Sequence, residues 1–120
     1  MHEASLAEQV VAIVERSAEP GARVLAITLE LGDLAGVEED ALLFALTSAM
    51  LHTRAEGATV HVLRLPARAR CHDCGGEQAI EIRYQPCGIC GRGGLEILQG
   101  TEMRVRSIVV EERKAIAETR

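Results

Sequence analysis

The sequence has very few aromatic side chains. Aromatic residues make up 2% of the 120 residues, with one phenylalanine, one tyrosine and no tryptophan. A hydrophobic core built from this chain must therefore be aliphatic. Proteins that bind single-stranded nucleic acid stack bases on aromatic rings, and Phe44 and Tyr84 offer almost no such surface. This scarcity argues against a nucleic-acid partner.

Positive charge and long apolar runs are lacking as well. Thirteen basic residues against eighteen acidic ones give a net charge of −5, which disfavours binding to phosphate backbones. No apolar run approaches the ~20 residues of a membrane span, and no secretory signal sequence opens the chain. With 48% hydrophobic and 26% charged residues, the composition is that of a folded domain. We therefore expect a cytoplasmic protein without membrane or nucleic-acid partners.

The four cysteines stand in one stretch, as Cys71-His-Asp-Cys74 and Cys87-Gly-Ile-Cys90, with twelve residues between the pairs. Disulfides belong mainly to exported proteins, because cytosolic thiols stay reduced. Two Cys-x-x-Cys pairs at this spacing predict a tetrahedral four-thiolate site for a structural Zn²⁺. Two redox dithiols or an iron–sulfur cluster are the alternatives. Glycines that allow tight turns follow the cysteines at Gly75, Gly88 and Gly91.

Two segments have the periodicity of amphipathic helices. The first is expected to begin at Ser5, because Ser5 and Glu8 fit a capping box, and to end before Pro20. The second is expected to begin at residues 38–40, Glu38-Glu39-Asp40, since acids are favourable in the first turn of a helix. The apolar stripes consist of Leu6, Val10, Ile13 and Val14 in the first helix and Leu42, Leu46, Ala49 and Met50 in the second.

Three segments are predicted to be strands: residues 23–31, 59–65 and 103–110. The first two should be a parallel pair, because a helix connects them. The predicted fold class is α/β (α+β), with two helices on a three-stranded mixed sheet and a polar, helical tail. In the first strand, one buried face is expected to carry Leu25, Ile27, Leu29 and Leu31, opposite Ala26, Thr28 and Glu30.

The residues between the second and third strands are rich in glycine, cysteine and arginine. We predict that residues 1–66 and 102–120 form an αβ core and that residues 67–101 form an inserted zinc-ribbon-like lobe. A lobe of roughly 35 residues is too small to fold on apolar burial alone, so the metal must supply much of its stability. Four arginines are expected to offset the negative charge of the thiolates: Arg68, Arg70, Arg83 and Arg92.

The chain begins Met1-His2-Glu3, and these residues can form a second metal site. The Met1 α-amine, the deprotonated amide nitrogen of His2 and the His2 imidazole can close fused chelate rings, and the amide nitrogen of Glu3 completes a square plane. Square-planar nitrogen coordination suits Ni(II) or Cu(II) rather than Zn²⁺. The alternative is that His2 is an ordinary exposed residue and Glu3 a first-turn acid.

Taken together, these features resemble one family, the hydrogenase nickel-incorporation accessory proteins of the HypA/HybF type. The resemblance covers essentially the whole chain and rests on the Met-His-Glu start, the Ser5-Leu-Ala helix opening, the αβαβ core, the inserted Cys-x-x-Cys pairs and the segment Gln99-Gly100-x-Glu102-Met103. It implies a nickel metallochaperone and no enzyme, with Ni(II) as cargo and a structural Zn²⁺. It also implies work with a nickel-handling maturation GTPase, delivery to the large subunit of nickel–iron hydrogenase and, in some organisms, service to urease accessory proteins.

The resemblance assigns individual metal ligands. His2 would be the principal nickel ligand, with the Met1 amine and the Glu3 backbone. Glu38 would be the acid near nickel, with Glu39 or Asp40 as alternatives. The zinc ligands would be Cys71, Cys74, Cys87 and Cys90.

The other histidines have simpler interpretations. His72 is expected to be an exposed side chain of the first cysteine turn, with a pH response as the alternative. His52 is expected to end the second helix, and His61 to pack or pair within its strand. An enzyme is not expected, because four thiolates leave no open position on zinc for water. The alternative function is a zinc-ribbon protein-interaction module without a second metal, and the sequence is compatible with a monomer or a homodimer.

Overall fold

The computed structural model describes residues 2–111. The elements are α1 (Glu3–Ser17), β1 (Val24–Gly32), α2 (Glu39–Ala49), β2 (Thr59–Leu65), β3 (Arg68–Cys71), β4 (Glu77–Ala79), β5 (Leu95–Gln99) and β6 (Met103–Val110). Among the described residues, two compact units are formed. The helical unit comprises residues 2–29, 38–61 and 105–111, and the cysteine unit comprises residues 30–37 and 62–104. No helix in the described part of the chain is long and apolar enough to cross a bilayer.

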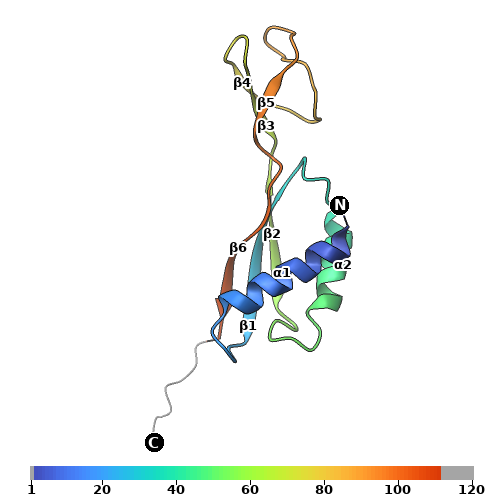
Figure 1. Ribbon diagram of the computed structural model, residues 1–120, viewed down its shortest axis with the longest axis vertical. Helices are drawn as coiled ribbons and strands as arrows, with labels where there is room; N and C mark the ends of the chain where they lie inside the picture. The colour runs from blue at the N-terminus through green and yellow to red at the C-terminus, as the bar shows by residue number, and fades with distance from the viewer. Residues whose placement is uncertain (1, 112–120) are drawn as a thin grey trace, which may run out of the picture. The chain divides into compact units, whose positions relative to one another are not determined.

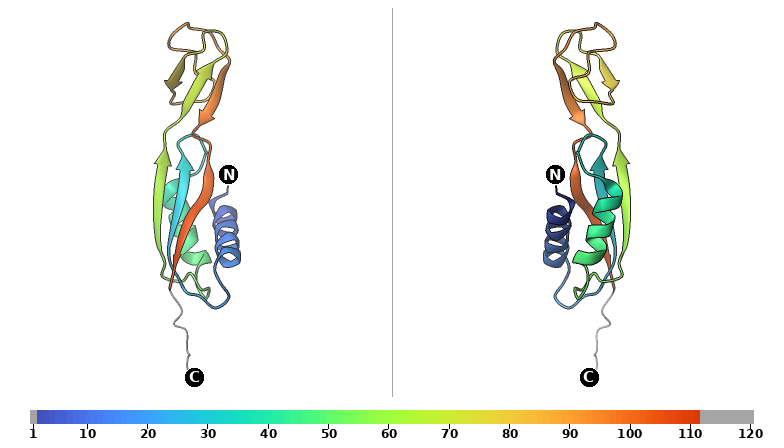
Figure 2. Two further views of the ribbon diagram at one scale, coloured as in Figure 1. Left: turned by 90° about the vertical axis from the view of Figure 1, so that its left-hand side faces the viewer. Right: turned by 90° about the vertical axis from the view of Figure 1, so that its right-hand side faces the viewer.

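Strands β2, β1 and β6 form a sheet in that order. β1 and β6 are antiparallel, because Gly32 donates to the carbonyl of Glu102 at one end while Glu111 donates to the carbonyl of Arg23 at the other. Figure 2 shows β1 and β2 running in the same direction and β6 running in the opposite one. The expected two helices and mixed three-stranded sheet are thus confirmed.

Helices α1 and α2 pack against each other and cover one face of the sheet in the helical unit (Figures 1 and 2). Aliphatic side chains of both helices and of β1 are buried, and burial of each large one stabilises the fold by roughly 1.5–3 kcal/mol. This core is aliphatic, as the scarcity of aromatic residues requires. Its buried members include Leu6, Val10, Val14, Val24, Ile27, Leu29, Leu42 and Leu46.

The first helix begins earlier than the sequence pattern indicates. α1 starts at Glu3 with His2 as its N-cap, so Ser5 lies inside the first turn and the predicted capping box is wrong. A tertiary contact accounts for the difference. The Glu3 carboxylate accepts a hydrogen bond from the backbone N–H of Glu38 at 3.0 Å, which fixes the helix start against α2. Local sequence cannot reveal a partner 35 residues away.

The burial of β1 also departs from simple alternation. Val24 is buried and Leu25 is exposed, so the prediction for Leu25 is wrong, whereas Ile27, Leu29 and Leu31 are buried as expected. Glu30, expected on the polar face, is only 8% exposed. Its carboxylate accepts a hydrogen bond from the Arg104 guanidinium on β6, and such a partner is what makes burial of a charge tolerable.

The strand predictions at residues 59–65 and 103–110 are confirmed by β2 and β6. Most of the tail predicted to be helical, residues 112–120, lies outside the described residues.

In the cysteine unit, β4, β3 and β5 form a second, antiparallel sheet in which Ala69 pairs with Gln78 on one side and Ile97 on the other. Its apolar cluster is small, as expected for a lobe that depends on a metal. Buried Ala67, Ala69 and Ile80 are joined by half-buried Leu34, Leu95 and Ile97. The domain boundaries predicted at residues 67 and 101 stay a prediction.

Candidate metal centre

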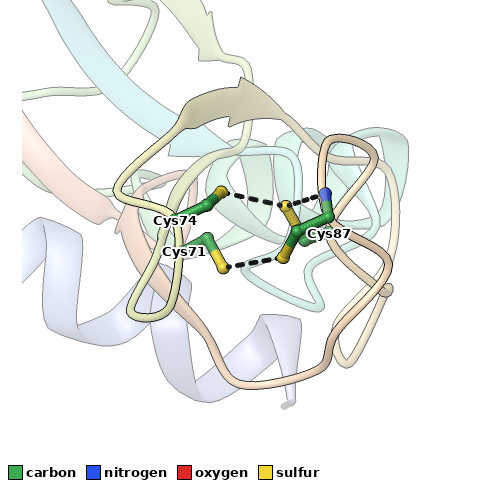
Figure 3. Close-up of side chains that lie close together, drawn as sticks. Cys71, Cys74 and Cys87 are labelled. Carbon is green, nitrogen blue, oxygen red and sulfur yellow. Dashed lines mark hydrogen bonds between the residues drawn. The ribbon is translucent and has the colours of Figure 1, made fainter.

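The four cysteine sulfurs converge in the cysteine unit. Cys71 is the last residue of β3, Cys74 lies in the turn that follows it, and Cys87 and Cys90 belong to a second turn between β4 and β5. All four Sγ atoms lie within 4.8 Å of one another. Two contacts across the pairs, Cys71 to Cys90 and Cys74 to Cys87, each measure 3.7 Å between sulfurs (Figure 3).

These separations fit a tetrahedral metal site. With zinc–sulfur bonds of about 2.3 Å, the edge of a tetrahedron of four thiolates is about 3.8 Å. A disulfide would instead require about 2.05 Å between sulfurs, and all four cysteines are free thiols. The side chains thus form a cage of the size and chemistry that a divalent cation with a preference for sulfur requires.

The two cysteine turns have the same backbone arrangement. Gly75 donates its N–H to the carbonyl of Cys71 at 2.9 Å, and Gly91 donates to the carbonyl of Cys87 at 2.8 Å. Both glycines are left-handed, with φ of 76° and 79°, which a side chain would disfavour. The requirement expected for Gly88 does not arise, because its φ is not positive. Each turn thereby aims two sulfurs at one point.

One sulfur is prepared to ionise by its hydrogen bonds. The Gln78 side-chain amide donates to Cys87 Sγ at 3.2 Å, and the backbone N–H groups of Cys90 and Ile89 donate to it at 3.4 and 3.3 Å. Together, with Gln78 contributing most, they lower the pKa of the Cys87 thiol to about 6. The thiolate is the form that binds metal, so these hydrogen bonds favour metal binding by Cys87.

The neighbouring thiols behave in the opposite way. The backbone N–H of Arg92 lowers the pKa of Cys90. Desolvation and the adjacent thiols of Cys71, Cys87 and Cys74 outweigh this effect and raise the pKa to about 12. Four sulfurs this close cannot all carry negative charge unless a cation balances it. A divalent metal that displaces the remaining protons balances the negative charge of all four thiolates.

A second group of polar residues lies in the helical unit, where α1 and α2 begin. The backbone N–H of Glu38 donates to the Glu3 carboxylate, and this hydrogen bond is the main reason that the pKa of Glu3 is lowered. Glu38 itself is the N-cap of α2, and its Oε1 accepts from Asp40 at 2.8 Å and from Ala41 at 3.2 Å. The structure therefore brings Glu3 and Glu38 together.

His2 immediately precedes this contact. As the N-cap of α1 it has an extended backbone, with φ −80° and ψ 118°, and its carbonyl accepts the N–H of Leu6 at 3.1 Å. Its exposed side chain makes no capping hydrogen bond. The first N–H groups of a helix have no partner within it, so the amide nitrogens of His2 and Glu3 can lose their protons without breaking the helix. Met1 lies outside the described residues.

Comparisons with known proteins show the family to which the chain belongs. The family described as "Hydrogenase/urease nickel incorporation, metallochaperone, hypA" matches residues 1–110. Hydrogenase maturation factors HypA from Geobacter metallireducens and Cereibacter sphaeroides are 43% and 46% identical, over 92% of this chain and all of each relative. The chain belongs to the HypA family.

Solved structures agree at the level of the fold. A solution structure of the nickel metallochaperone HypA from Helicobacter pylori superposes with a TM-score of 0.68 at 21% identity, over 92% of this chain and 97% of that one. A second solution structure of a HypA protein gives a TM-score of 0.69 with the same coverage and identity. HypA proteins are hydrogenase maturation factors, and this chain shares both their sequence and their architecture.

The remaining histidines do not join the cysteine cluster in the described part of the chain. His72 is exposed, as expected. The prediction for His52 is wrong in detail, because α2 ends at Ala49 and His52 follows in a turn with φ 64°, its N–H donating to Glu56. His61 is exposed on β2, so the expectation that it packs there is wrong, and the alternative that it pairs within the strand stays a prediction.

Two features of this region are invisible to sequence reasoning. Gln78 was not singled out, although it donates to Cys87 Sγ and accepts from the N–H of Gly88 at 2.7 Å, and no spacing rule marks it. Arg70, expected to offset the charge of the cysteines, pairs with Glu77 at 2.9 Å across the β3–β4 ladder. Both contacts depend on the strand register, which only the fold supplies.

Proposed function

We propose that this HypA-family protein binds Ni(II) as cargo at its amino terminus and passes it on for maturation of nickel–iron hydrogenase. The observation that carries the proposal is the position of His2. It is the N-cap of α1, with its imidazole exposed, directly beside the hydrogen bond between Glu3 and Glu38. A chelate placed there would be fixed by the contact between the starts of α1 and α2 and would remain open to solvent.

The nickel ligands follow from the chemistry of that position. The Met1 amine, the amide nitrogens of His2 and Glu3 and the His2 imidazole supply four nitrogens in a square plane, the geometry that Ni(II) accepts and Zn²⁺ avoids. Two deprotonated amides neutralise the charge of Ni(II), so the complex adds no net positive charge at the positive end of the helix dipole. Glu38 is the acid that we place nearest the metal, with Glu39 and Asp40 as alternatives.

The four cysteines are proposed to hold a structural Zn²⁺. Cys71, Cys74, Cys87 and Cys90 would fill the coordination sphere, which leaves no position for water or substrate. The metal would stabilise the cysteine unit, and we assign no enzymatic activity to the chain. The proposed partners are a nickel-handling maturation GTPase, the hydrogenase large subunit and, where present, urease accessory proteins. The choice between monomer and homodimer, and the cytoplasmic location, stay predictions.

The test is to move the α-amine. Adding a few residues before Met1 converts the amine into an amide, so nickel affinity should fall by orders of magnitude while zinc content and fold remain unchanged. Isothermal titration of zinc-loaded, untagged protein with Ni(II), together with the d–d absorption of a square-planar ion, measures the effect. A carboxy-terminal tag without histidine is the matched control.

A pair of histidine variants sharpens this test. His2→Ala should abolish tight nickel binding because it removes the imidazole, whereas His61→Ala, on a side chain that is also exposed, should leave the affinity unchanged. If the extended protein binds nickel as tightly as the native chain, the backbone chelate is wrong and a side-chain site at His2 and Glu38 replaces it. If the native chain takes up no stoichiometric nickel, the zinc-ribbon interaction module is the better function.

A further inference from the structure

A hollow of about 460 Å³ lies between the two helices of the helical unit. Most of its lining consists of small side chains, and the ring of Phe44 stands beside them with 78% of its surface exposed. An aromatic ring left in solvent next to a depression of methyl groups is characteristic of a binding surface, where such a ring can bury a large area. The lining residues are Ala4, Glu8, Phe44, Ala45, Ser48 and Ala49.

The surroundings of this hollow are acidic. Glu8 lines it, and Asp40, exposed one helical turn before Phe44, lies on the same side of α2. Over both helices and the N-cap of α2 there is one basic residue, Arg16, in the last turn of α1. The acidic residues of the same segments are Glu3, Glu8, Glu15, Glu38, Glu39 and Asp40.

We propose that this hollow is a docking groove for an amphipathic helix of a partner protein. Apolar side chains at positions i, i+4 and i+7 of that helix would pack against Phe44 and the alanines, and flanking lysines or arginines would face Glu8 and Asp40. An aromatic anchor beside a small pocket with a charged rim is the usual anatomy of a helix-in-groove interface. The acidic rim selects a basic helix over an acidic one.

The acidic side chains around the groove argue against two other occupants, a second copy of this chain and the chain's own residues 112–120. A second copy of this chain would bring identical acidic rims together across a two-fold axis, and like charges repel. Residues 112–120 of the chain carry three basic and two acidic side chains, so they offer little net positive charge. Charge complementarity therefore favours a separate, basic partner.

The inference goes beyond the proposed nickel function and does not require it. Glu8 follows His2 by six residues along α1, a rise of roughly 9 Å, so a helix seated in the groove would lie close to the proposed nickel site. Docking can nevertheless be measured on zinc-loaded protein without nickel. Failure of the groove and failure of the nickel site are then separate results.

The experiment uses a defined probe, an 18-residue helical peptide with leucines along one face and lysines elsewhere. A matched peptide carries glutamates in place of the lysines. Titrated into the full-length ¹⁵N-labelled protein, the lysine peptide should shift the amide signals of the groove residues, and the glutamate peptide should shift none. Phe44→Ser should weaken binding of the lysine peptide at least about tenfold, the effect of truncating an interface anchor. Glu8→Gln should weaken it less and reduce its dependence on salt.

The control variant is Tyr84→Ser, which removes the other exposed aromatic ring, in the cysteine unit, and should leave the affinity unchanged. Three results would overturn the proposal. The first is binding that Phe44→Ser does not weaken, or shifts that map outside the groove. The second is a dimer of the free protein, seen by sedimentation, that Phe44→Ser abolishes. The third is a shift of the groove signals when residues 112–120 are deleted, which would make the chain's own end the occupant.

Discussion

The helical unit and the cysteine unit differ in what holds them together. The first buries many large aliphatic side chains from α1, α2 and β1, whereas the buried cluster of the second around its own sheet is Ala67, Ala69 and Ile80. Apolar burial stabilises in proportion to area, so we expect the helical unit to be stable on its own and the cysteine unit to need a further source of stability. A four-thiolate metal site supplies the missing free energy where the side chains are small.

The two candidate metal sites differ in the same way. The cysteine site has two buried and two exposed thiols closed around one point, with all four ligands from the protein. The proposed amino-terminal site would be open to solvent, because the His2 side chain is exposed and its backbone lies at the start of α1. A closed site retains its ion, whereas an open one with titratable ligands can release it. A site that retains its ion suits a structural role, and a site that can release its ion suits delivery of a metal.

The largest expected effect comes from removing one thiolate. Cys74→Ala, or a chelator strong enough to strip zinc, should disorder roughly residues 67–101 while the helical unit keeps its fold, because structural zinc contributes about 10–16 kcal/mol in small domains. Amide spectra should lose the dispersed signals of the cysteine unit alone, and metal analysis should show the loss of zinc. His72→Ala, an exposed change within the same turn, is the control. Full zinc content in Cys74→Ala would disprove the four-thiolate site.

Lowering the pH should mainly weaken nickel binding at the proposed amino-terminal site. Protons compete with Ni(II) for the amine, the imidazole and the amides, so nickel affinity should fall at least about tenfold per pH unit between neutral and mildly acidic solution. Competition titrations with a nickel-binding dye at pH 7.5, 7.0 and 6.5 measure this slope. An affinity that stays constant over that range is incompatible with nitrogen ligation.

Gln78→Ala should loosen the zinc without unfolding the cysteine unit. Its amide is the main cause of the lowered pKa of Cys87, and loss of such a supporting hydrogen bond commonly costs 10–100-fold in metal affinity. Transfer of zinc to a colorimetric chelator should be faster by roughly that factor. Gln85→Ala is the matched control, since Gln85 instead accepts the N–H of Glu81. Equal transfer rates for the two variants would show that Gln78 has no part in holding the metal.

The smallest effect is expected at the contact between the helix starts. The ionised Glu3 carboxylate binds the N–H of Glu38, and this holds its pKa below the ordinary 4.5. Stability from a lowered carboxyl pKa is fully present above pH 4.5 and is lost as the pH falls through the folded-state value. Glu3→Gln should therefore lower Tm by about 1–3 °C at pH 7, and the difference should shrink in acid. A difference that grows below pH 4.5 would contradict this sign.

The same variant separates two roles of Glu3 in nickel binding. Glu3→Gln retains the backbone amide and removes the carboxylate charge, so nickel affinity should change little if the amide nitrogen is the ligand. A large loss of affinity would instead make the Glu3 side chain a nickel ligand.

Several features of the fold could be predicted from the sequence because their causes are local or periodic. The bounds of β2 and β6 follow from their apolar patterns, and the position of α2 follows from its acidic first turn. The two Cys-x-x-Cys pairs predict a sulfur cluster, because each pair spans a single tight turn whose geometry is set by neighbouring residues. The start of α1 was misplaced because it is fixed by Glu38, far away in the chain.

The sequence by itself therefore determined the aliphatic core, the mixed α/β architecture and the likeness to HypA proteins, since periodicity, composition and short-range spacing carry that information. Only the tertiary structure decided which side chains meet: Gln78 with Cys87, Glu3 with Glu38, and Phe44 with the alanine-lined hollow. Each of these pairings depends on strand register or helix packing. Such contacts form when distant segments are brought together, and no local pattern records them.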